Sequence, residues 1–200
     1  MSLAGFAQLQ TVENRLVAPL VDDINPTWVL EIAPVTSSSP ALGCERERLL
    51  ADAGGISWPF SAAIDALPLD ADSVPLVLVR HLWQPGFDAD PLADIVRVLK
   101  PGGTLISVTA NPWHRKSWQV LGRDALWLPS WPRWQLLHAR GELETCMKSS
   151  LRWKSLVPGV SPVLILVAQK PRRPATVKRV QFGRPLFGGA AAAVSQYRAA

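Results

Sequence analysis

The sequence predicts an α/β fold: a mostly parallel sheet with helices on both faces, closed by an antiparallel hairpin near the C-terminal end. Strand-like and helix-like segments alternate through the first two thirds of the chain, which is typical of parallel sheets with crossover helices. Two later strand-like segments, 143–153 and 161–170, are joined by a link too short for a crossover, so they must pair antiparallel. A length of 200 residues and a hydrophobic content of 48% allow one domain with a sizeable core.

The N-terminal part is expected to contain a helix, a strand and a second helix. Apolar residues that begin with Leu3, Phe6 and Leu9 recur at helical spacing and predict a helix over 2–22. The apolar run 27–33 predicts a buried strand. Residues 40–52 favour a second helix, because a proline suits a first turn and Glu, Arg and Leu follow it.

The middle of the chain predicts further strands around another helix. A strand-like segment starts at Ile56, and the short β-rich run 75–81 fits a buried strand. The next helix ends near Leu99, with Asp88 or Asp90 as its N-cap. The sequence Lys-Pro-Gly-Gly that follows stops this helix before a strand over 104–110. Because phosphate-binding loops lie between a strand and a helix, this glycine pair is not interpreted as one.

Charge divides the chain into two parts. Residues 1–144 carry a net charge of −5, whereas residues 145–200 carry +10 and no acidic residue. We therefore expect a folded domain over 1–170 and a basic, alanine-rich tail over 171–200. Such a tail either binds an anionic or protein partner or is simply solvated.

Several classes of protein are excluded by what the sequence lacks. The N-terminus has no basic segment followed by an apolar one, and no apolar run is long enough to span a membrane. Cys44 and Cys146 form neither a disulfide framework nor a metal-ligand cluster. We expect a cytoplasmic protein without a metal site.

One segment carries a specific resemblance. Asp65–Ala66, Leu67–Pro68, a strand over Val74–His81, a helix and Arg97–Gly103 follow one another at a characteristic spacing. In this order the segment resembles the class I S-adenosylmethionine-dependent methyltransferases of the type-11 group, over about residues 27–170. The resemblance implies a Rossmann-like methyltransferase sandwich with S-adenosylmethionine as cofactor. Asn111–Trp113 and Gln196–Arg198 are similar to a small proteobacterial, methyltransferase-like branch, which implies a bacterial protein.

The resemblance implies a set of cofactor-binding residues. The carboxylate of Asp65 would accept a hydrogen bond from the adenine amino group, and the backbone N–H of Ala66 would donate to a ring nitrogen. Glu31 and Ala33 would lie beside the methionine part, at the end of the first strand. His81 would face the same crevice and is the candidate catalytic base. Asp65 could instead form a turn, Glu31 a strand-end salt bridge, and His81 could be a bonded histidine without a catalytic role.

Tryptophans gather after the strand over 104–110. Trp83, Asn111, Trp113 and Trp118 are candidates for a pocket that binds a flat or apolar methyl acceptor. The aromatic residues could instead pack as a cluster against the sheet edge, or, with the interleaved Arg and Lys, stack on nucleic acid. Nucleic acid is the weakest of these three interpretations.

The chain also departs from the family at the cofactor loop. The residues after Glu31 are Ile-Ala-Pro-Val-Thr-Ser, where the family has a glycine-rich loop, and Pro34 removes an N–H donor. Pro75 stands where the family usually has Asp. No acidic residue closes a second strand if Glu45 and Glu47 lie on a helix, which leaves open an abbreviated strand–helix unit there.

Two hypotheses follow from these departures. The first is an active methyltransferase that acts on a small or lipid-like acceptor despite its degraded loop. The second is an inactive pseudoenzyme that serves as a binding or regulatory partner through its basic C-terminal section. An open loop over 33–39, lined with N–H donors, would favour the first hypothesis, and a loop filled by Pro34 and Val35 would favour the second.

Overall fold

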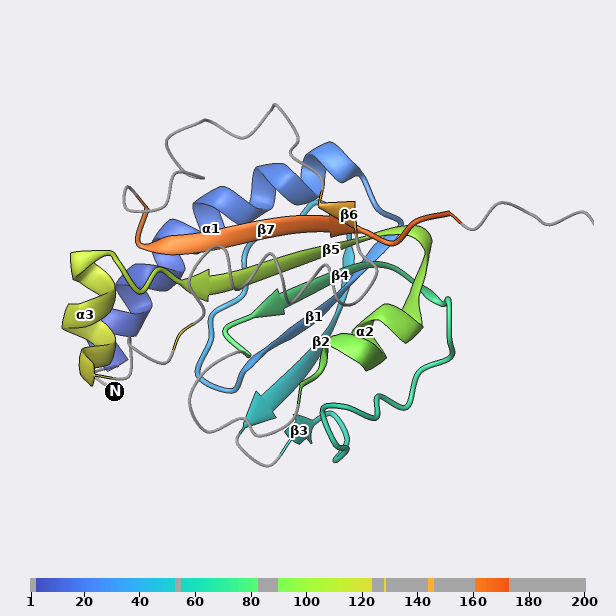
Figure 1. Ribbon diagram of the computed structural model, residues 1–200, viewed down its shortest axis with the longest axis horizontal. Helices are drawn as coiled ribbons and strands as arrows, with labels where there is room; N and C mark the ends of the chain where they lie inside the picture. The colour runs from blue at the N-terminus through green and yellow to red at the C-terminus, as the bar shows by residue number, and fades with distance from the viewer. Residues whose placement is uncertain are drawn as a thin grey trace, which may run out of the picture.

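The computed structural model describes residues 3–52, 55–82, 90–123, 128, 144–145 and 161–172. In chain order its elements are α1 (Leu3–Ile24), β1 (Trp28–Pro34), β2 (Glu45–Asp52), β3 (Gly55–Trp58), β4 (Val74–Arg80), α2 (Leu92–Val98), β5 (Leu99–Ala110), α3 (Arg115–Leu121), β6 (Glu144–Thr145) and β7 (Val163–Gln169). The strands form one seven-stranded sheet in the order β3-β2-β1-β4-β5-β7-β6 (Figure 1).

The sheet is mostly parallel in its centre and antiparallel at its edges. β1 pairs in parallel with β2 and β4, and β4 pairs in parallel with β5. β7 runs antiparallel to both β5 and β6, which confirms the predicted C-terminal hairpin. At the opposite edge β3 is antiparallel to β2.

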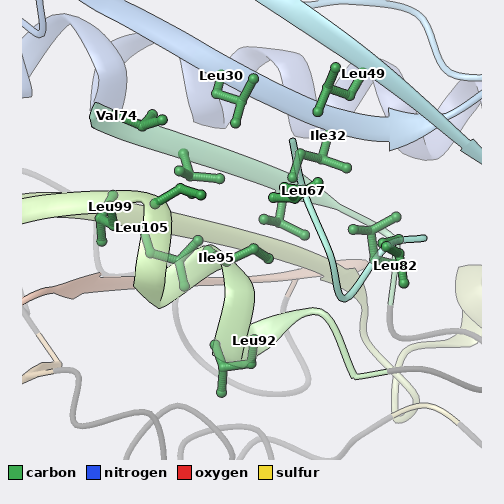
Figure 2. Close-up of a cluster of buried hydrophobic side chains, with 14 of the residues drawn as sticks. Leu30, Ile32, Leu49, Leu67, Val74, Leu82, Leu92, Ile95, Leu99 and Leu105 are labelled. Carbon is green, nitrogen blue, oxygen red and sulfur yellow. The ribbon is translucent and has the colours of Figure 1, made fainter. Parts of the chain in front are cut away.

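Helices cover both faces of the sheet. Alternate residues of each strand point to opposite faces, so the sheet contributes to two separate cores. On one face the apolar residues of α2 pack against Leu30, Val77 and Leu105, and Figure 2 shows part of this cluster between the sheet and α2. On the other face, residues of α1 and α3 pack against Val29, Leu76 and further strand residues. The predicted α/β sandwich is confirmed, and residues 2–22 and 27–33 match α1 and β1 closely.

The prediction of a helix over 40–52 is wrong. Residues Glu45–Asp52 form β2, and all of them except Asp52 pair with β1. Glu, Arg and Leu favour helix, but intrinsic propensity is a weak preference that tertiary contacts override. Leu49 and Ala51 are buried in the core on the α2 face, two residues apart as in a strand.

The connection between β1 and β2 is short. Residues 35–44 join these two parallel strands without a helix, so the strand–helix unit at this place is indeed abbreviated. The crossover helix that would normally cover this part of the sheet is replaced by an irregular segment. We call residues 35–44 the serine loop, after Ser37, Ser38 and Ser39.

The helix around residues 90–99 begins and ends close to the prediction. Of the two predicted capping residues, Asp90 stands one residue before the N-cap, which is Pro91, and its Oδ1 accepts the backbone N–H of Leu92 at 3.0 Å. The other, Asp88, and the tail from residue 173 onward lie outside the described residues. No helix in the described part of the chain is long and apolar enough to cross a membrane.

The glycine pair after α2 has a structural role. Gly102 has a φ of +79°, which favours glycine, and a Cβ on Gly103 would lie 2.8 Å from the carbonyl oxygen of Lys100 and 3.0 Å from that of Pro75. The prediction that the pair stops the helix is wrong, because α2 already ends at Val98 and both glycines lie inside β5. The pair instead lets the chain turn and lets the start of β5 approach β4 closely.

Gly103→Ala should lower the free energy of unfolding by about 1–3 kcal/mol, because the added methyl group meets two backbone oxygens that cannot move independently. Gly43→Ala is the matched control, since its Cβ would lie 3.6 Å from the nearest side-chain atom; it should change stability by less than about 0.5 kcal/mol. Urea unfolding of both variants checks the difference, and equal effects would contradict it.

Candidate functional site

The strand order identifies where a ligand site would lie. The chain runs outward from β1 to β2 and β3, and then returns to place β4 and β5 on the other side of β1. In open α/β sheets, ligands bind beyond the carboxyl ends of the strands at this point of reversal. The candidate crevice therefore lies between the ends of β1 and β4, beside the serine loop.

A buried guanidinium occupies this position. Arg80 is the last residue of β4 and is fully buried. It donates hydrogen bonds to Glu31 Oε1 at 2.8 Å, to Asn14 Oδ1 at 3.1 Å, and at short range to Glu13 Oε1. One arginine thus pairs with carboxylates from α1 and β1, both of which are also fully buried.

The second oxygen of Glu31 is also bound by the protein. Its Oε2 accepts a hydrogen bond from the Ser39 hydroxyl at 3.1 Å. The Nε atoms of Arg46 and Arg48 on β2 lie 3.5 and 3.6 Å from the same oxygen. Glu31, which was expected to lie beside the methionine part of the cofactor, is held from three sides by side chains of this chain.

His81 faces Glu13 rather than an open crevice. It is almost fully buried, and its Nε2 lies 3.0 Å from Glu13 Oε2. Its φ of +52° is uncommon for a residue other than glycine, and such backbone strain gathers at functional sites. The contact with Glu13 involves only Nε2, so base chemistry by His81 would have to use the other ring nitrogen, Nδ1.

The pKa of Glu13 shows that this network stabilises its ionised form relative to its protonated form. Burial alone would raise it, but the neighbouring His81 and Arg80 lower the pKa of Glu13 from 4.5 to about 2. Burial likewise opposes the charge of Arg80, while its hydrogen bonds to Glu13 and Glu31 raise the pKa of the guanidinium. Both groups are therefore ionised at neutral pH.

The serine loop turns its carbonyl groups toward arginines. The carbonyl oxygens of Ser37, Ser38 and Pro40 accept hydrogen bonds from Arg48, Arg80 and Arg46 respectively. A glycine-rich cofactor loop works in the opposite way, because it presents backbone N–H donors to the ligand.

Several N–H groups of the serine loop are already used. Val35 donates to Ala51 O at 3.3 Å, and Ser37 donates to Pro34 O at 2.9 Å. Ser38 donates to the side chain of Gln10 in α1 at 3.1 Å. These three N–H donors are therefore bonded within the chain, and it is Arg80, rather than Pro34 or Val35, that lies buried beside the serine loop. Val35 itself is 51% exposed.

The adenine-binding candidates lie on a separate loop between β3 and β4. Asp65 and Ala66 are both exposed, and the backbone N–H of Ala66 donates to Ala63 O at 3.2 Å in a turn. Asp65 lies in the loop that follows β3, well past the end of that strand at Trp58.

The ion pair between Asp94 and Arg97 of α2 holds this loop by hydrogen bonds to its backbone. Asp94 Oδ2 accepts the backbone N–H of Leu67 at 2.5 Å, and Arg97 donates to the carbonyl oxygens of Leu67 and Leu69 at 2.7 and 2.8 Å. Burial would raise the pKa of Asp94, but hydrogen bonds from Arg97 and from the Leu67 N–H lower it. Arg97, the first residue of the family-like motif, therefore fixes the path of the loop.

An acidic residue does end the second strand. Asp52 is the last residue of β2 and is exposed. Sequence reasoning missed it because Glu45–Asp52 was assigned to a helix. The two-residue spacing of Leu49 and Ala51, followed by an acid, was the available signal. Glu13 was missed for another reason: it meets Arg80 from 67 residues away, and no local pattern reports that contact.

Three of the four tryptophan-region candidates lie among the described residues. Asn111 is buried; its amide donates to Ser161 O at 2.9 Å, and its Oδ1 accepts the Trp113 N–H at 3.0 Å. Trp113 and Trp118 are 74% and 42% exposed. Trp83 lies outside the described residues, and among the described residues no group of His, Cys, Asp or Glu could hold a metal.

Comparison with known proteins identifies the fold. No family model and no curated protein matches the chain. Among solved structures, it is similar to a geranyl diphosphate methyltransferase in complex with S-adenosylmethionine, with a TM-score of 0.53 and 15% identity over 83% of this chain and 88% of that one. It is also similar to a methyltransferase from Aquifex aeolicus, with a TM-score of 0.52 and 12% identity over 76% and 88% of the two chains.

A third similar structure is a possible histamine N-methyltransferase from Thermotoga maritima, with a TM-score of 0.50 and 15% identity over 80% of this chain and 89% of that one. These likenesses show that the chain has the fold of S-adenosylmethionine-dependent methyltransferases. Because the sequence identities are low, these similarities support no conclusion beyond the fold.

Arg80→Leu should lower the free energy of unfolding by about 3–5 kcal/mol, because it leaves two buried carboxylates without their shared partner. Arg15→Leu, which changes an exposed arginine of α1, is the control and should have an effect below about 0.5 kcal/mol. Chemical denaturation measures both. Similar stability of the two variants would mean that the Arg80 ion pairs do not hold the fold together.

Acid should weaken the fold through Glu13. Because the pKa of Glu13 is lower in the folded chain than its ordinary 4.5, its contribution is complete above about pH 4.5 and is lost as the pH falls toward 2. Glu13→Gln should be less stable at pH 7 and should show a shallower loss of melting temperature between pH 5 and pH 2. Parallel melting curves for the two proteins across that range would contradict this assignment.

Proposed function

We propose that this protein has kept the methyltransferase fold without methyl transfer, and that it serves as a binding protein. The observation that carries the proposal is the buried Arg80 guanidinium, which pairs with Glu13 and Glu31 where the cofactor would lie. The chain's own residues supply every partner that this guanidinium and these two carboxylates need.

The free energy of displacing this network supports the proposal. A cofactor that entered the crevice would have to separate Arg80 from at least one buried carboxylate, at a cost of about 3–5 kcal/mol. That cost weakens binding by roughly a hundredfold to several thousandfold, so a site of micromolar affinity becomes millimolar or nearly so.

The loop argues in the same direction. The methionine carboxylate of the cofactor needs N–H donors, and the serine loop offers carbonyl oxygens that are bound to arginines instead. Without this anchor the remaining candidates, Asp65 and Ala66, would hold the adenine alone. A partner of the basic C-terminal section, protein or otherwise anionic, then becomes the expected ligand of this protein.

The alternative is an active methyltransferase for a small or lipid-like acceptor. Asp52 favours it, because this exposed acid ends β2, where the family's ribose-binding residue would be expected. Methyl transfer from a sulfonium needs mainly positioning, so few catalytic side chains would be required. In this alternative Arg80 would leave the crevice when the cofactor binds.

Thermal unfolding and calorimetry with S-adenosylmethionine and S-adenosylhomocysteine test the proposal. We expect no binding heat and a shift in melting temperature below about 1 °C at 1 mM ligand. Were the dissociation constant about 10 µM, this concentration would add about 2.7 kcal/mol of stability, which is a shift of roughly 5–10 °C.

Asp52→Ala and Asp65→Ala make the outcome specific. A saturable shift that disappears in both variants would establish cofactor binding at the crevice and would overturn the proposal. A small shift that both variants retain would indicate binding elsewhere and would leave the closed crevice as described.

A further inference from the structure

The segment from Asn111 to Arg123 presents an unusual surface. Trp113 and Trp118 are exposed there, together with Arg115, Lys116 and Arg123, and the segment contains no acidic residue. We call these five residues the tryptophan face. Three of the five, Arg115, Lys116 and Trp118, belong to α3, which lies beyond the end of β5 in Figure 1.

Hydrogen bonds between residues close in sequence fix the backbone of this face. The Trp113 N–H donates to Asn111 Oδ1, and His114 caps α3 through its Nδ1, which accepts the N–H of Lys116 at 3.1 Å. Asn111 in turn donates to the carbonyl oxygen of Ser161, at the start of the segment that leads into β7. The two tryptophans are thus mounted on a tethered turn rather than on a free loop.

The polar atom of Trp118 is already used within the chain. Its indole Nε1 donates to the carbonyl oxygen of Pro112 at 2.7 Å, while 42% of the residue is exposed. The exposed part therefore offers an aromatic surface and not a hydrogen-bond donor. Trp113, at 74% exposed, offers a second one five residues earlier.

We propose that the tryptophan face binds single-stranded nucleic acid. Aromatic rings that stack on bases, next to cations that contact phosphates, are how proteins bind single strands without sequence preference. Arg115 and Lys116 lie between the two tryptophans in sequence and supply the cations. The inference goes beyond the proposed function, since it does not depend on whether the cofactor crevice is closed.

The same features argue against a lipid surface as the ligand. Tryptophans at a membrane interface present an apolar body to the lipid and keep the N–H for the wet side. In Trp118 the N–H is already bonded to the carbonyl oxygen of Pro112, so it does not serve the wet side of such an interface. The site is small, and three cations predict a salt slope of about −2 in log affinity against log salt concentration.

Fluorescence anisotropy with fluorescein-labelled (dT)12 and (U)12 tests the proposal on the full chain at several salt concentrations. We expect binding at low salt, with the slope given above. Trp113→Ala and Trp118→Ala should each weaken binding about tenfold or more. Lys116→Ala should make the salt slope shallower by about 0.7.

Trp58→Ala is the matched control. Trp58 is 55% exposed and lies on β3, at one edge of the sheet, whereas α3 follows β5. This variant should bind as the unaltered protein does. Trp118→Phe keeps a ring without the indole N–H and should keep most of the affinity, which separates stacking from any effect of the lost Pro112 contact.

Three results would overturn the proposal. The first is no binding of either oligonucleotide at low salt. The second is full binding by the Trp113→Ala/Trp118→Ala double variant with an unchanged melting temperature, which would assign the interaction to another basic part of the chain. The third is binding to vesicles that contain phosphatidylserine, lost in the double variant, with none to oligonucleotides.

Discussion

The ion pairs of Arg80 are the constraint on which the rest of this structure depends. A guanidinium without access to water is tolerated only if its charge and its N–H groups are matched within the protein. Glu13 from α1 and Glu31 from β1 provide that match, and Ser38 adds a carbonyl oxygen from the serine loop. One side chain at the end of β4 thereby joins a helix, a neighbouring strand and the loop that replaces a crossover helix.

The residues at the reversal of strand order bind one another through carbonyl oxygens and guanidinium groups. The fold brings the ends of β1 and β4 together, as in sheets that bind nucleotide-like ligands there. Where such a ligand would meet N–H donors, this chain has carbonyl oxygens directed at Arg46, Arg48 and Arg80. These three carbonyl acceptors are therefore bonded within the chain.

Sequence reasoning predicted the elements that depend on local pattern, and it missed those that depend on distant partners. The periodicity of α1 and the apolar runs of β1, β4 and β5 predicted the layers correctly. β2 was missed because its Glu and Arg side chains favour helix in isolation, whereas its pairing with β1 and its contacts with Glu31 exist only in the folded chain. The loop's lack of glycines is visible in the sequence, but the contacts of Arg80 with Glu13 and with the serine loop are not.

The ion pair of Asp94 and Arg97 gives a structural role to the most recognisable motif of this chain, Arg97–Gly103. Arg97 holds the backbone of the loop at Leu67 and Leu69, and Gly103 permits the close approach of β5 to β4. Each of these contacts serves folding, and none requires a bound ligand. A chain that lost its cofactor would still need both residues to assemble the same sheet. The motif is therefore a marker of architecture, and a protein identified by it alone could be an enzyme or could have long ceased to be one.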